Sequence, residues 1–454
     1  MSVQVQPVRL MTRRVGLRLA ALVGGAGGTG ALAAACGQSA GGTPEYKPGA
    51  QPVTISFSHW GTESGLGQMN REAARQFTAQ YPNIKMDLIF KPDDYLTHLQ
   101  TMFAGGSAPD VFDISTPDFP AWAKNDTMRE ADAYVKRDQG KGFDWNDLWP
   151  RHRDAGKYKG KTLGVLARIS PYVLYYNPSM FQRAGIKQPD QTWGLAEFTE
   201  AARKLTAPPG ANGNSDVYGY ALVNRHHWIW RNGADYLTAK DDKWKPTINT
   251  PAFVEGMQNL IDLRQKYRVI GSAAELGNPG GTLPNYGSWI TNQQIAMHDA
   301  LVARVPDYRS DPKMTFDRFD VAHLPKLNGA RQTDMDRVVR PISKPSKSPE
   351  EGWLWIKFLL SKPAITAVSM PAVMSWVKSN EFLRPDLPPR NMKVFLDVVE
   401  YARTVPEHPR WSDLNKLIAK QLDDAYAGKQ SAKQACEQAD RDVAAQLQQW
   451  GELG

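Results

Sequence analysis

Hydrophobic and polar residues alternate along the first part of the chain in a way that predicts a layered α/β fold. Short stretches with period-two alternation or a continuous apolar run, typical of strands, are separated by stretches in which apolar residues recur at helical spacing. Strands are expected at 53–60, 85–90 and 110–114, with helices between them at 68–81 and 95–104. This order of strands and helices predicts a parallel sheet.

The same alternation restarts after residue 158 and continues to the C-terminus, without an internal repeat. The expected pieces are strands at 163–166, 172–176 and 320–324, and helices at 196–205, 252–268, 350–361 and 412–450, the last being one or more helices. A chain of 454 residues is long enough to divide into two cores. We therefore expect two α/β lobes whose strands come from separate stretches of the sequence.

Candidate binding residues follow the predicted strands of the first sheet. Trp60 ends the first strand, Glu63 lies in the glycine-rich turn behind it, and Asp113 ends the third strand. Ligands of parallel α/β sheets bind beyond the carboxyl ends of the strands, which favours a site here. Each residue also has a structural interpretation: Trp60 packed under the next helix, Glu63 as a solvated acid near a helix start, and Asp113 capping a turn.

The net charge of +8 at first suggests a nucleic-acid partner. Residues 1–35 carry four arginines and no acid, and the rest of the chain has 51 basic and 47 acidic residues. No dense run of Lys and Arg with interleaved aromatic residues occurs. We therefore expect no nucleic-acid binding.

The N-terminus has the features of an export signal. Residues 12–18, with Arg13 and Arg14, resemble the twin-arginine pattern, and a weakly apolar, glycine-rich stretch follows to Ala35. Residues 32–37 resemble a lipobox that ends in Cys36, the candidate lipidation site. Ala33 departs from the large aliphatic residue usual at its position. The alternative is a transmembrane anchor, which the shortness of the stretch disfavours.

The predicted segments are a signal peptide at 1–36 and a flexible tether at 37–52, which is rich in Gly, Ser and Pro. With Cys36 acylated, Cys436 is the one cysteine left, so no intramolecular disulfide is expected. Cys436 lies in a helical pattern and is interpreted as a buried small apolar residue.

Several short segments, in order and spacing through residues 53–450, resemble the family 1 extracellular solute-binding proteins. These are the maltose-binding-protein-like components of ABC sugar importers. The most recognisable segment is Ala104–Val111. The others are Tyr81–Ile84, Tyr158–Gly164, Leu174–Asn177, Thr192–Trp193, Gln294–Met297, Val321–Lys326, Ile342–Lys347 and Ala427–Ser431.

The resemblance implies a two-lobed, type II periplasmic-binding-protein-like α/β fold with a ligand cleft between discontinuous lobes. One lobe would comprise 53–168 plus 341–373 and the other 169–340 plus 374–454, with crossings near 169–173, 338–342 and 372–375. It further implies a lipid-anchored extracytoplasmic monomer that closes on a carbohydrate and passes it to ABC permease subunits, with no cofactor.

Further aromatic candidates gather in the second half of the chain. Trp228 and Trp230 belong to the densest aromatic cluster, and their alternation predicts that one faces the cleft and the other the lobe. His226 and His227 precede them, but no Cys, Asp or Glu stands at metal-ligand spacing nearby, so no metal site is expected. Trp289 precedes a predicted helix. Asp299 follows the strand at 296–297, where related proteins place a ligand-contacting polar residue.

Residues near the predicted crossings complete the candidate set. Arg168 and Arg340 could bridge two hydroxyls or bind a carboxylate, or they could form a salt bridge between the lobes. Tyr172 and Trp376 are expected as aromatic walls. Other tryptophans in helical contexts are interpreted as core residues: Trp149, Trp193, Trp353 and Trp355.

Two other functions stay open. An anionic solute, such as a uronate or a glycerol phosphate ester, would gain support if Arg168 or Arg340 faced the pocket without a protein carboxylate partner. A glycoside-processing enzyme would need two carboxylates about 5–10 Å apart, and nothing marks Glu63 and Asp113 as such a pair. No catalytic residues are therefore assigned.

Overall fold

The computed structural model describes residues 46–60, 66–91, 94–210, 215–241, 243–271, 292–328, 331–361 and 370–454. All of them belong to the compact unit Pro44–Gly454. Cys36 with the expected export signal, Glu63 and Trp289 lie outside the described residues. Within these residues, no helix combines the length and the apolar character needed to cross a membrane.

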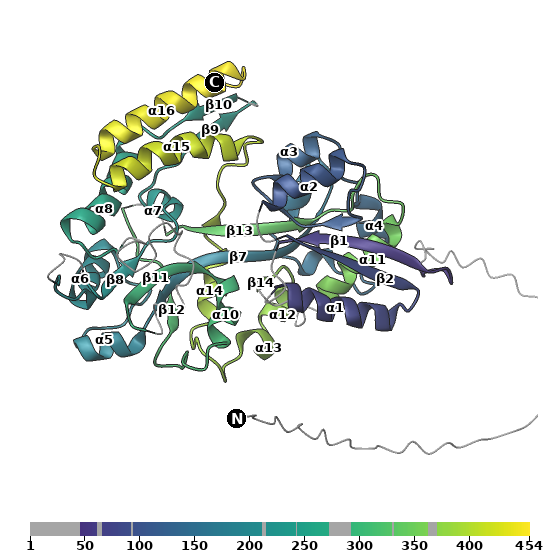
Figure 1. Cartoon of the computed structure of the whole chain (residues 1–454), viewed down its shortest axis with the longest axis horizontal. Helices are drawn as coiled ribbons and strands as arrows, with labels where there is room; N and C mark the ends of the chain where they lie inside the picture. Colours follow the sequence, from purple (N-terminus) through teal and green to yellow (C-terminus); the bar gives the residue numbers. More distant parts are fainter. Residues whose placement is uncertain are drawn as a thin grey trace, which may run out of the picture. The chain divides into compact units, whose positions relative to one another are not determined.

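The N-terminal sheet confirms the strand–helix–strand pattern. Strands β1 (Val53–His59), β2 (Ile84–Phe90) and β3 (Val111–Phe112) are parallel in the order β2-β1-β3. Helix α1 (Leu66–Gln80) connects the first two strands, and α2 (Tyr95–Ala104) connects the next pair (Figure 1). Helix α2 has the predicted bounds, because the glycine pair after Ala104 ends it.

A larger sheet is built on two long antiparallel strands, β7 (Val165–Tyr176) and β13 (Thr333–Arg340), which run side by side in Figure 1. Its order is β15-β13-β7-β11-β8, and three short strands outside this order pair with the long strands: β12 and β14 with β7, and β4 with β13. The other bounds are β4 (Ile114–Ser115), β8 (Tyr218–Ala221), β11 (Ile295–Leu301), β12 (Asp320–Ala322), β14 (Met370–Pro371) and β15 (Ala402–Arg403).

Strand β7 corrects the sequence prediction, which had two separate strands at 163–166 and 172–176. It is continuous because its hydrogen-bonding partners change along its length. β13 pairs with Val165–Pro171, whereas β11 and β12 pair with residues up to Tyr176. Pro171 lies where the partners change, a position at which the missing backbone N–H of proline is tolerated in a strand.

Two hydrophobic cores meet along β7. Val173 and Tyr175 belong to the core that also contains β1, β3 and α11 (Pro349–Ser361), whereas Leu174 and Tyr176 belong to the core with α15 (Trp411–Tyr426) and α16 (Ala432–Gln449). Successive side chains of a strand point to opposite faces, so one strand serves both cores. The lobe boundaries expected from the sequence stay a prediction.

The remaining helices are mostly short and cover the sheets (Figure 1). Their bounds are α3 (Phe119–Lys124), α4 (Asp132–Asp138), α5 (Pro178–Ala184), α6 (Leu195–Leu205), α7 (His226–Arg231), α8 (Pro251–Ile261), α10 (Val305–Arg309), α12 (Met374–Val377), α13 (Asn380–Leu383) and α14 (Lys393–Val399). Two hairpins complete the fold: β5 (Lys157–Tyr158) with β6 (Lys161–Thr162), and β9 (Leu237–Lys240) with β10 (Lys243–Pro246).

Several local predictions can be compared with these elements. The helix expected at 252–268 is α8 followed by a π-helical turn at Asp262–Lys266. The segment 412–450 forms two helices, and a capping box between Ser431 and Gln434 starts the second. The expected core residues are buried, with exposed fractions of 5% or less: Trp149, Trp193, Trp353, Trp355 and Cys436.

Candidate functional site

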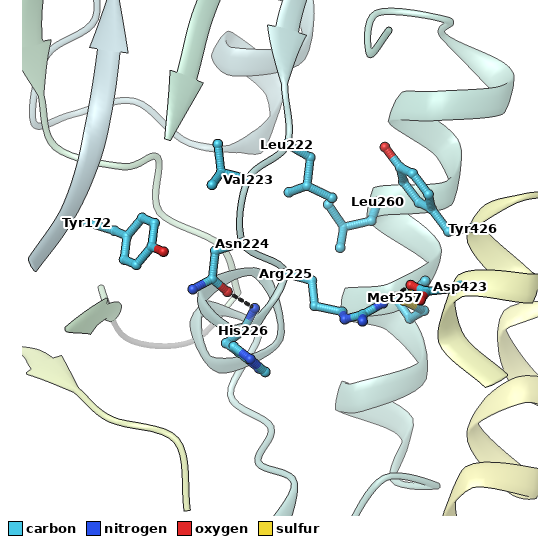
Figure 2. A pocket seen from close by; sticks show the side chains of 10 residues that line it. All are labelled: Tyr172, Leu222, Val223, Asn224, Arg225, His226, Met257, Leu260, Asp423 and Tyr426. Carbon is cyan, nitrogen blue, oxygen red and sulfur yellow. Dashed lines mark hydrogen bonds and ion pairs between the residues drawn. The ribbon is translucent and has the colours of Figure 1, made fainter. Parts of the chain in front are cut away.

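A pocket of about 380 Å³ lies beside the end of β8, and we name it the Tyr172–Asn224 pocket (Figure 2). The loop 222–226, which runs from β8 into α7, forms one wall, and helices α8 and α15 form the other. Its lining residues are Tyr172, Leu222, Val223, Asn224, Arg225, His226, Met257, Leu260, Asp423 and Tyr426.

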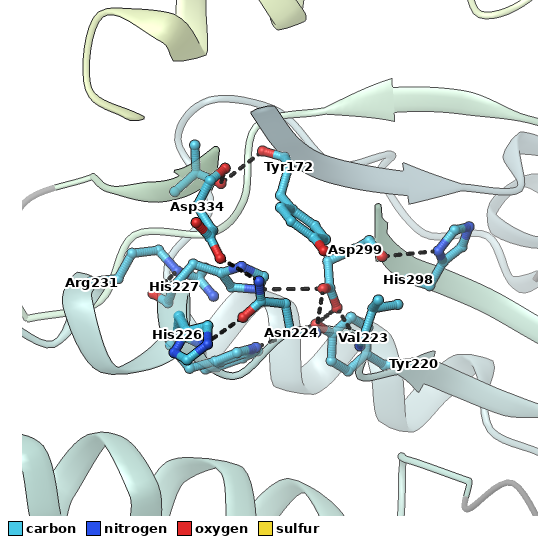
Figure 3. A network of polar contacts seen from close by, with 12 residues as sticks. Tyr172, Tyr220, Val223, Asn224, His226, His227, Arg231, His298, Asp299 and Asp334 are labelled. Carbon is cyan, nitrogen blue, oxygen red and sulfur yellow. Dashed lines mark hydrogen bonds and ion pairs between the residues drawn. The ribbon is translucent and has the colours of Figure 1, made fainter. Parts of the chain in front are cut away.

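Asp299 of β11 holds the backbone of this loop (Figure 3). Its Oδ1 accepts hydrogen bonds from the Tyr220 hydroxyl (2.5 Å) and the Val223 N–H (3.0 Å), and its Oδ2 accepts one from the Asn224 N–H (2.8 Å). The side chain of Asp299 is fully buried, and burial raises its pKa to about 6. Asp299 therefore shapes the loop from inside the protein and does not line the pocket.

The side chain of Asn224 is fixed at both ends. Its Nδ2 donates to Asp334 Oδ2 at 2.5 Å, and its Oδ1 accepts from the His226 N–H at 2.7 Å. Asn224 also hydrogen-bonds to the hydroxyl of Tyr172, which reaches the pocket from β7. These contacts join strands β7 and β13 to the loop around a single amide group (Figure 3).

The charged groups of the pocket wall balance each other. Arg225 forms an ion pair with Asp423 across the pocket. His226 is uncharged at neutral pH, because burial lowers its pKa to about 3. The remaining polar lining consists of an amide and two tyrosine hydroxyls, with leucine, valine and methionine side chains beside them. This combination suits a solute with hydroxyl groups and no net charge.

Asp113 and both candidate arginines form one buried cluster, which we name the Asp113 cluster. Arg168 Nη1 lies 2.9 Å from Asp113 Oδ2, and Arg340 Nε lies 2.7 Å from Asp113 Oδ1. Burial alone would raise the pKa of Asp113, but the charges of Arg340 and Arg168 outweigh it and hold this pKa below its ordinary value. The arginines therefore have the carboxylate partner that the salt-bridge interpretation required.

The Asp113 cluster and the Tyr172–Asn224 pocket share one face of β7. Arg168 and Tyr172 are four residues apart, so both side chains leave the strand on the same side, about 13 Å apart. Ser170 lies between them on that side, and Asp334 and Asp336 alternate on the neighbouring strand β13. A row of polar side chains thus links the two groups.

Trp60 lies at the end of β1, as expected, and is half-buried. Its ring packs on that of Tyr95, with 4.4 Å between the centroids. The hydroxyl of Tyr95 lies 2.8 Å from the backbone carbonyl of Asp113. Trp60 is thereby connected to the Asp113 cluster through one aromatic side chain.

The structure corrects the interpretation of Trp228 and Trp230. Both lie on α7, a helix instead of an alternating segment, and the exposed fraction of each is 0%. Trp228 packs on Phe198 and Tyr220, and Trp230 packs on His226 and Tyr236. Neither indole presents a face to the pocket, because the helix turns both into the second core.

Trp376 is also placed apart from Tyr172. It lines a different pocket, of about 390 Å³, together with Phe143, Asp147 and Ser375. Its ring packs on Phe382. The structure thus brings Trp60, Asp113, Arg168, Tyr172 and Arg340 into linked positions, buries Trp228, Trp230 and Asp299, and leaves Trp376 at a separate surface.

Sequence reasoning missed Asn224, Arg225 and Tyr426. Asn224 and Arg225 lie three and four residues after the end of β8, so the strand-end rule would have pointed to this loop had the short strand at 218–221 been predicted. Tyr426 is the last residue of α15 and had no local signal. In the part of the chain that the structure describes, no group of three or more His, Cys, Asp or Glu side chains could hold a metal ion.

Replacing Asp113 tests the buried cluster. We expect Asp113→Asn to lower the free energy of unfolding by about 3–5 kcal/mol, because the buried Arg340 and the partly buried Arg168 lose their shared counter-charge. Because the arginines depress the pKa of Asp113, the carboxylate stays charged above its unfolded pKa, and the loss should persist from pH 5 to 8. Chemical denaturation measures it.

The matched control is Glu72→Gln, which removes an exposed carboxylate from an arginine on α1. We expect no measurable change in its unfolding curve, since water screens exposed ion pairs. Equal stability of Asp113→Asn and the wild type would contradict the structural role of the Asp113 cluster.

Comparison with solved structures shows the same fold in ABC sugar-binding proteins. The ABC substrate-binding protein of Listeria monocytogenes in complex with cycloalternan has a TM-score of 0.76 at 23% identity, covering 88% of this chain and 100% of that chain. A maltose-bound protein of T. maritima has a TM-score of 0.72 at 20% identity, covering 87% and 100%. The expected two-lobed α/β fold is therefore confirmed.

Proteins related in sequence give less detail about the ligand. A Brucella abortus protein named for binding alone is 25% identical over 386 residues, which covers 80% of this chain and 86% of the relative. The mannitol-binding protein of Pseudomonas aeruginosa is 22% identical over 268 residues, covering 56% of each. Residues 72–375 match the family described as bacterial extracellular solute-binding protein. That match spans more than half of the chain, and this protein belongs to the bacterial extracellular solute-binding protein family.

Proposed function

We propose that this protein binds an uncharged carbohydrate along the polar face of β7 and β13, outside the cytoplasm. The observation that carries the proposal is the charge balance of this face. Arg168 and Arg340 both pair with Asp113, Asp336 is a second carboxylate near Arg168, and Arg225 pairs with Asp423, so each of these arginines has a protein carboxylate beside it. A sugar offers hydroxyl groups to amide and phenol groups and C–H faces to apolar side chains, which is the chemistry of this lining.

The solved structures of the same fold support this ligand class. Those named above were determined with cycloalternan and maltose, and that of a Thermotoga lettingae protein with α-D-tagatose. All of these ligands are uncharged. An anionic ligand loses the argument that favoured it, because both Arg168 and Arg340 have a carboxylate partner.

The wider role in transport is part of the same proposal. We expect export by the twin-arginine route and lipidation at Cys36, which would anchor the protein to the membrane. The loaded protein would then deliver its sugar to ABC permease subunits. The protein would act as a monomer and release its ligand unchanged. The family consists of binding proteins, which supports a function without catalysis. Glu63 and Trp289 are proposed as further contacts of the ligand.

A ligand screen by thermal denaturation tests the ligand class. A ligand that binds only the folded state stabilises it by about 2.7 kcal/mol at one hundred times its Kd. We expect at least one of maltose, maltotriose, mannitol and tagatose to raise the melting temperature by several degrees. Galacturonate and glycerol phosphate should leave it unchanged. Stabilisation by the anions alone would overturn the proposal in favour of an acidic solute.

Trp60→Ala tests the aromatic surface. We expect it to weaken sugar binding by about 2 kcal/mol, roughly thirtyfold in Kd, because an indole face that stacks on a sugar ring is lost.

Trp193→Ala is the control for Trp60→Ala. Trp193 is 5% exposed in the second core, so its removal should lower stability by about 3–5 kcal/mol and leave the Kd of the folded fraction unchanged. Calorimetry and thermal denaturation of both variants separate binding from folding; normal affinity of Trp60→Ala would remove Trp60 from the site.

Cys36→Ser tests the anchor. If Cys36 carries the lipid, the variant should leave the membrane fraction when cells are fractionated, while the wild type stays in it. Retention of an uncleaved variant in the membrane would show that the N-terminal segment is itself the anchor.

A further inference from the structure

Two buried carboxylates outside the pocket wall converge on the loop 222–226. Asp299 approaches from β11 and Asp334 from β13, and their exposed fractions are 0% and 8%. Burying a carboxylate is costly unless its oxygens accept hydrogen bonds. Three of their hydrogen bonds come from Val223 and Asn224 of this short loop, and the others come from the Tyr220 hydroxyl and the Met335 N–H. The loop is thus held by both carboxylates at once.

The contacts fix the orientation of the Asn224 amide. The ionised Asp334 carboxylate can only accept, so it selects the Nδ2 side of the amide, and the His226 N–H can only donate, so it selects the Oδ1 side. A flipped amide would place donor against donor at His226 and acceptor against acceptor at Asp334. Asp299 meanwhile holds the backbone of Val223 and Asn224.

We propose that Asp299 and Asp334 are positioning residues of the Tyr172–Asn224 pocket, which fix the loop and the amide of Asn224 in the orientation that meets the ligand. This inference rests on the proposed function, because it assigns how the same site is kept ready for a sugar. Hydrogen-bonding groups that are held rigidly before binding do not have to be ordered by the ligand. Asp299 acts through the loop, and Asp334 acts through the side chain of Asn224.

The network should also make binding depend on pH. Burial raises the pKa of Asp334 to about 7. The groups around Asp334 are Asn224, Asp336, Arg403, Tyr172 and Tyr236.

Asp299 has its raised pKa of about 6 and faces Tyr220, His227 and Arg231. His227 does not titrate in this range, because burial lowers its pKa well below the ordinary value. As the pH falls through 7 and then 6, each aspartate takes up a proton and loses an acceptor. Affinity should therefore be higher at pH 8 than at pH 5.

The test uses Asp299→Asn and Asp334→Asn in the full chain. In Asp299→Asn the remaining amide oxygen can still accept the hydrogen bonds of the Tyr220 hydroxyl and the Val223 N–H. The new NH₂ group is a donor, so it cannot accept from the Asn224 N–H. In Asp334→Asn the remaining amide oxygen can still accept from the Met335 N–H, but the new NH₂ group cannot accept from Asn224 Nδ2. Asp334→Asn keeps the inference testable if Asp299→Asn does not fold.

Asp320→Asn is the matched control. Asp320 is also a buried strand aspartate, 5% exposed, and accepts from the Val321 and Asn391 N–H groups. None of these residues lines the pocket. The control should therefore lose stability without changing the loop or the affinity.

Hydrogen–deuterium exchange of the peptide covering 222–226 gives a readout without ligand. We expect exchange to be about tenfold faster in Asp299→Asn and Asp334→Asn, and unchanged in Asp320→Asn. Titration with maltose at pH 8 should show Kd raised about tenfold or more in both variants, and Asp334→Asn should lose the pH dependence centred near 7.

The outcomes separate the two proposals. If the wild type binds none of the sugars in the screen, the proposed function fails, while the exchange rates still decide whether the two aspartates hold the loop. If the wild type binds maltose and all three variants match its affinity and loop exchange, the positioning role is wrong. Equal losses in Asp320→Asn would show a general effect of destabilisation and would also overturn it.

Discussion

The alternation of side chains along β7 is the constraint on which the rest of the structure depends. Its last residues divide between two cores, with Val173 and Tyr175 on one side and Leu174 and Tyr176 on the other. If a strand that is covered on both faces shifted by one residue, every side chain would move to the opposite face, and both cores would have to repack. The register of β7 with β13 and β11 is therefore strongly specified, and so is the position of every polar residue that precedes Val173.

The polar row on this strand pair is stabilised by pairing, not by exposure to water. Asp113 accepts hydrogen bonds from Arg168 on β7 and Arg340 on β13. Asp334 of β13 and Asp299 of β11 accept hydrogen bonds from Asn224 in the loop behind the pocket. Buried charges of this kind add little net stability compared with apolar residues, but removing one partner is costly. They therefore act mainly on geometry: they determine which donors and acceptors stay in place for a ligand and which charges are cancelled.

The candidate site was only partly predictable. The strand-end rule found Trp60 and Asp113, because a parallel sheet places such residues at one edge whatever the details of packing. It did not find Asn224, because β8 has four residues and no alternation to reveal it. Trp228 and Trp230 were assigned wrongly, since three alternating aromatic and aliphatic residues fit a strand and a short buried helix equally well. Only the surrounding core decides between them.

The sequence by itself determined the fold class, the order of the first strands and helices, and bounds such as those of α2. These depend on the period of apolar residues and on local stop signals, which act over a few residues. Tertiary structure alone decided the burial of Trp228 and Trp230, the continuity of β7 through Pro171, and the pairing of Asp113 with Arg340, 227 residues away. These features depend on which distant segments come into contact. The free energies of burial and of charge pairing arise only once those contacts form, so no local pattern in the sequence reports them.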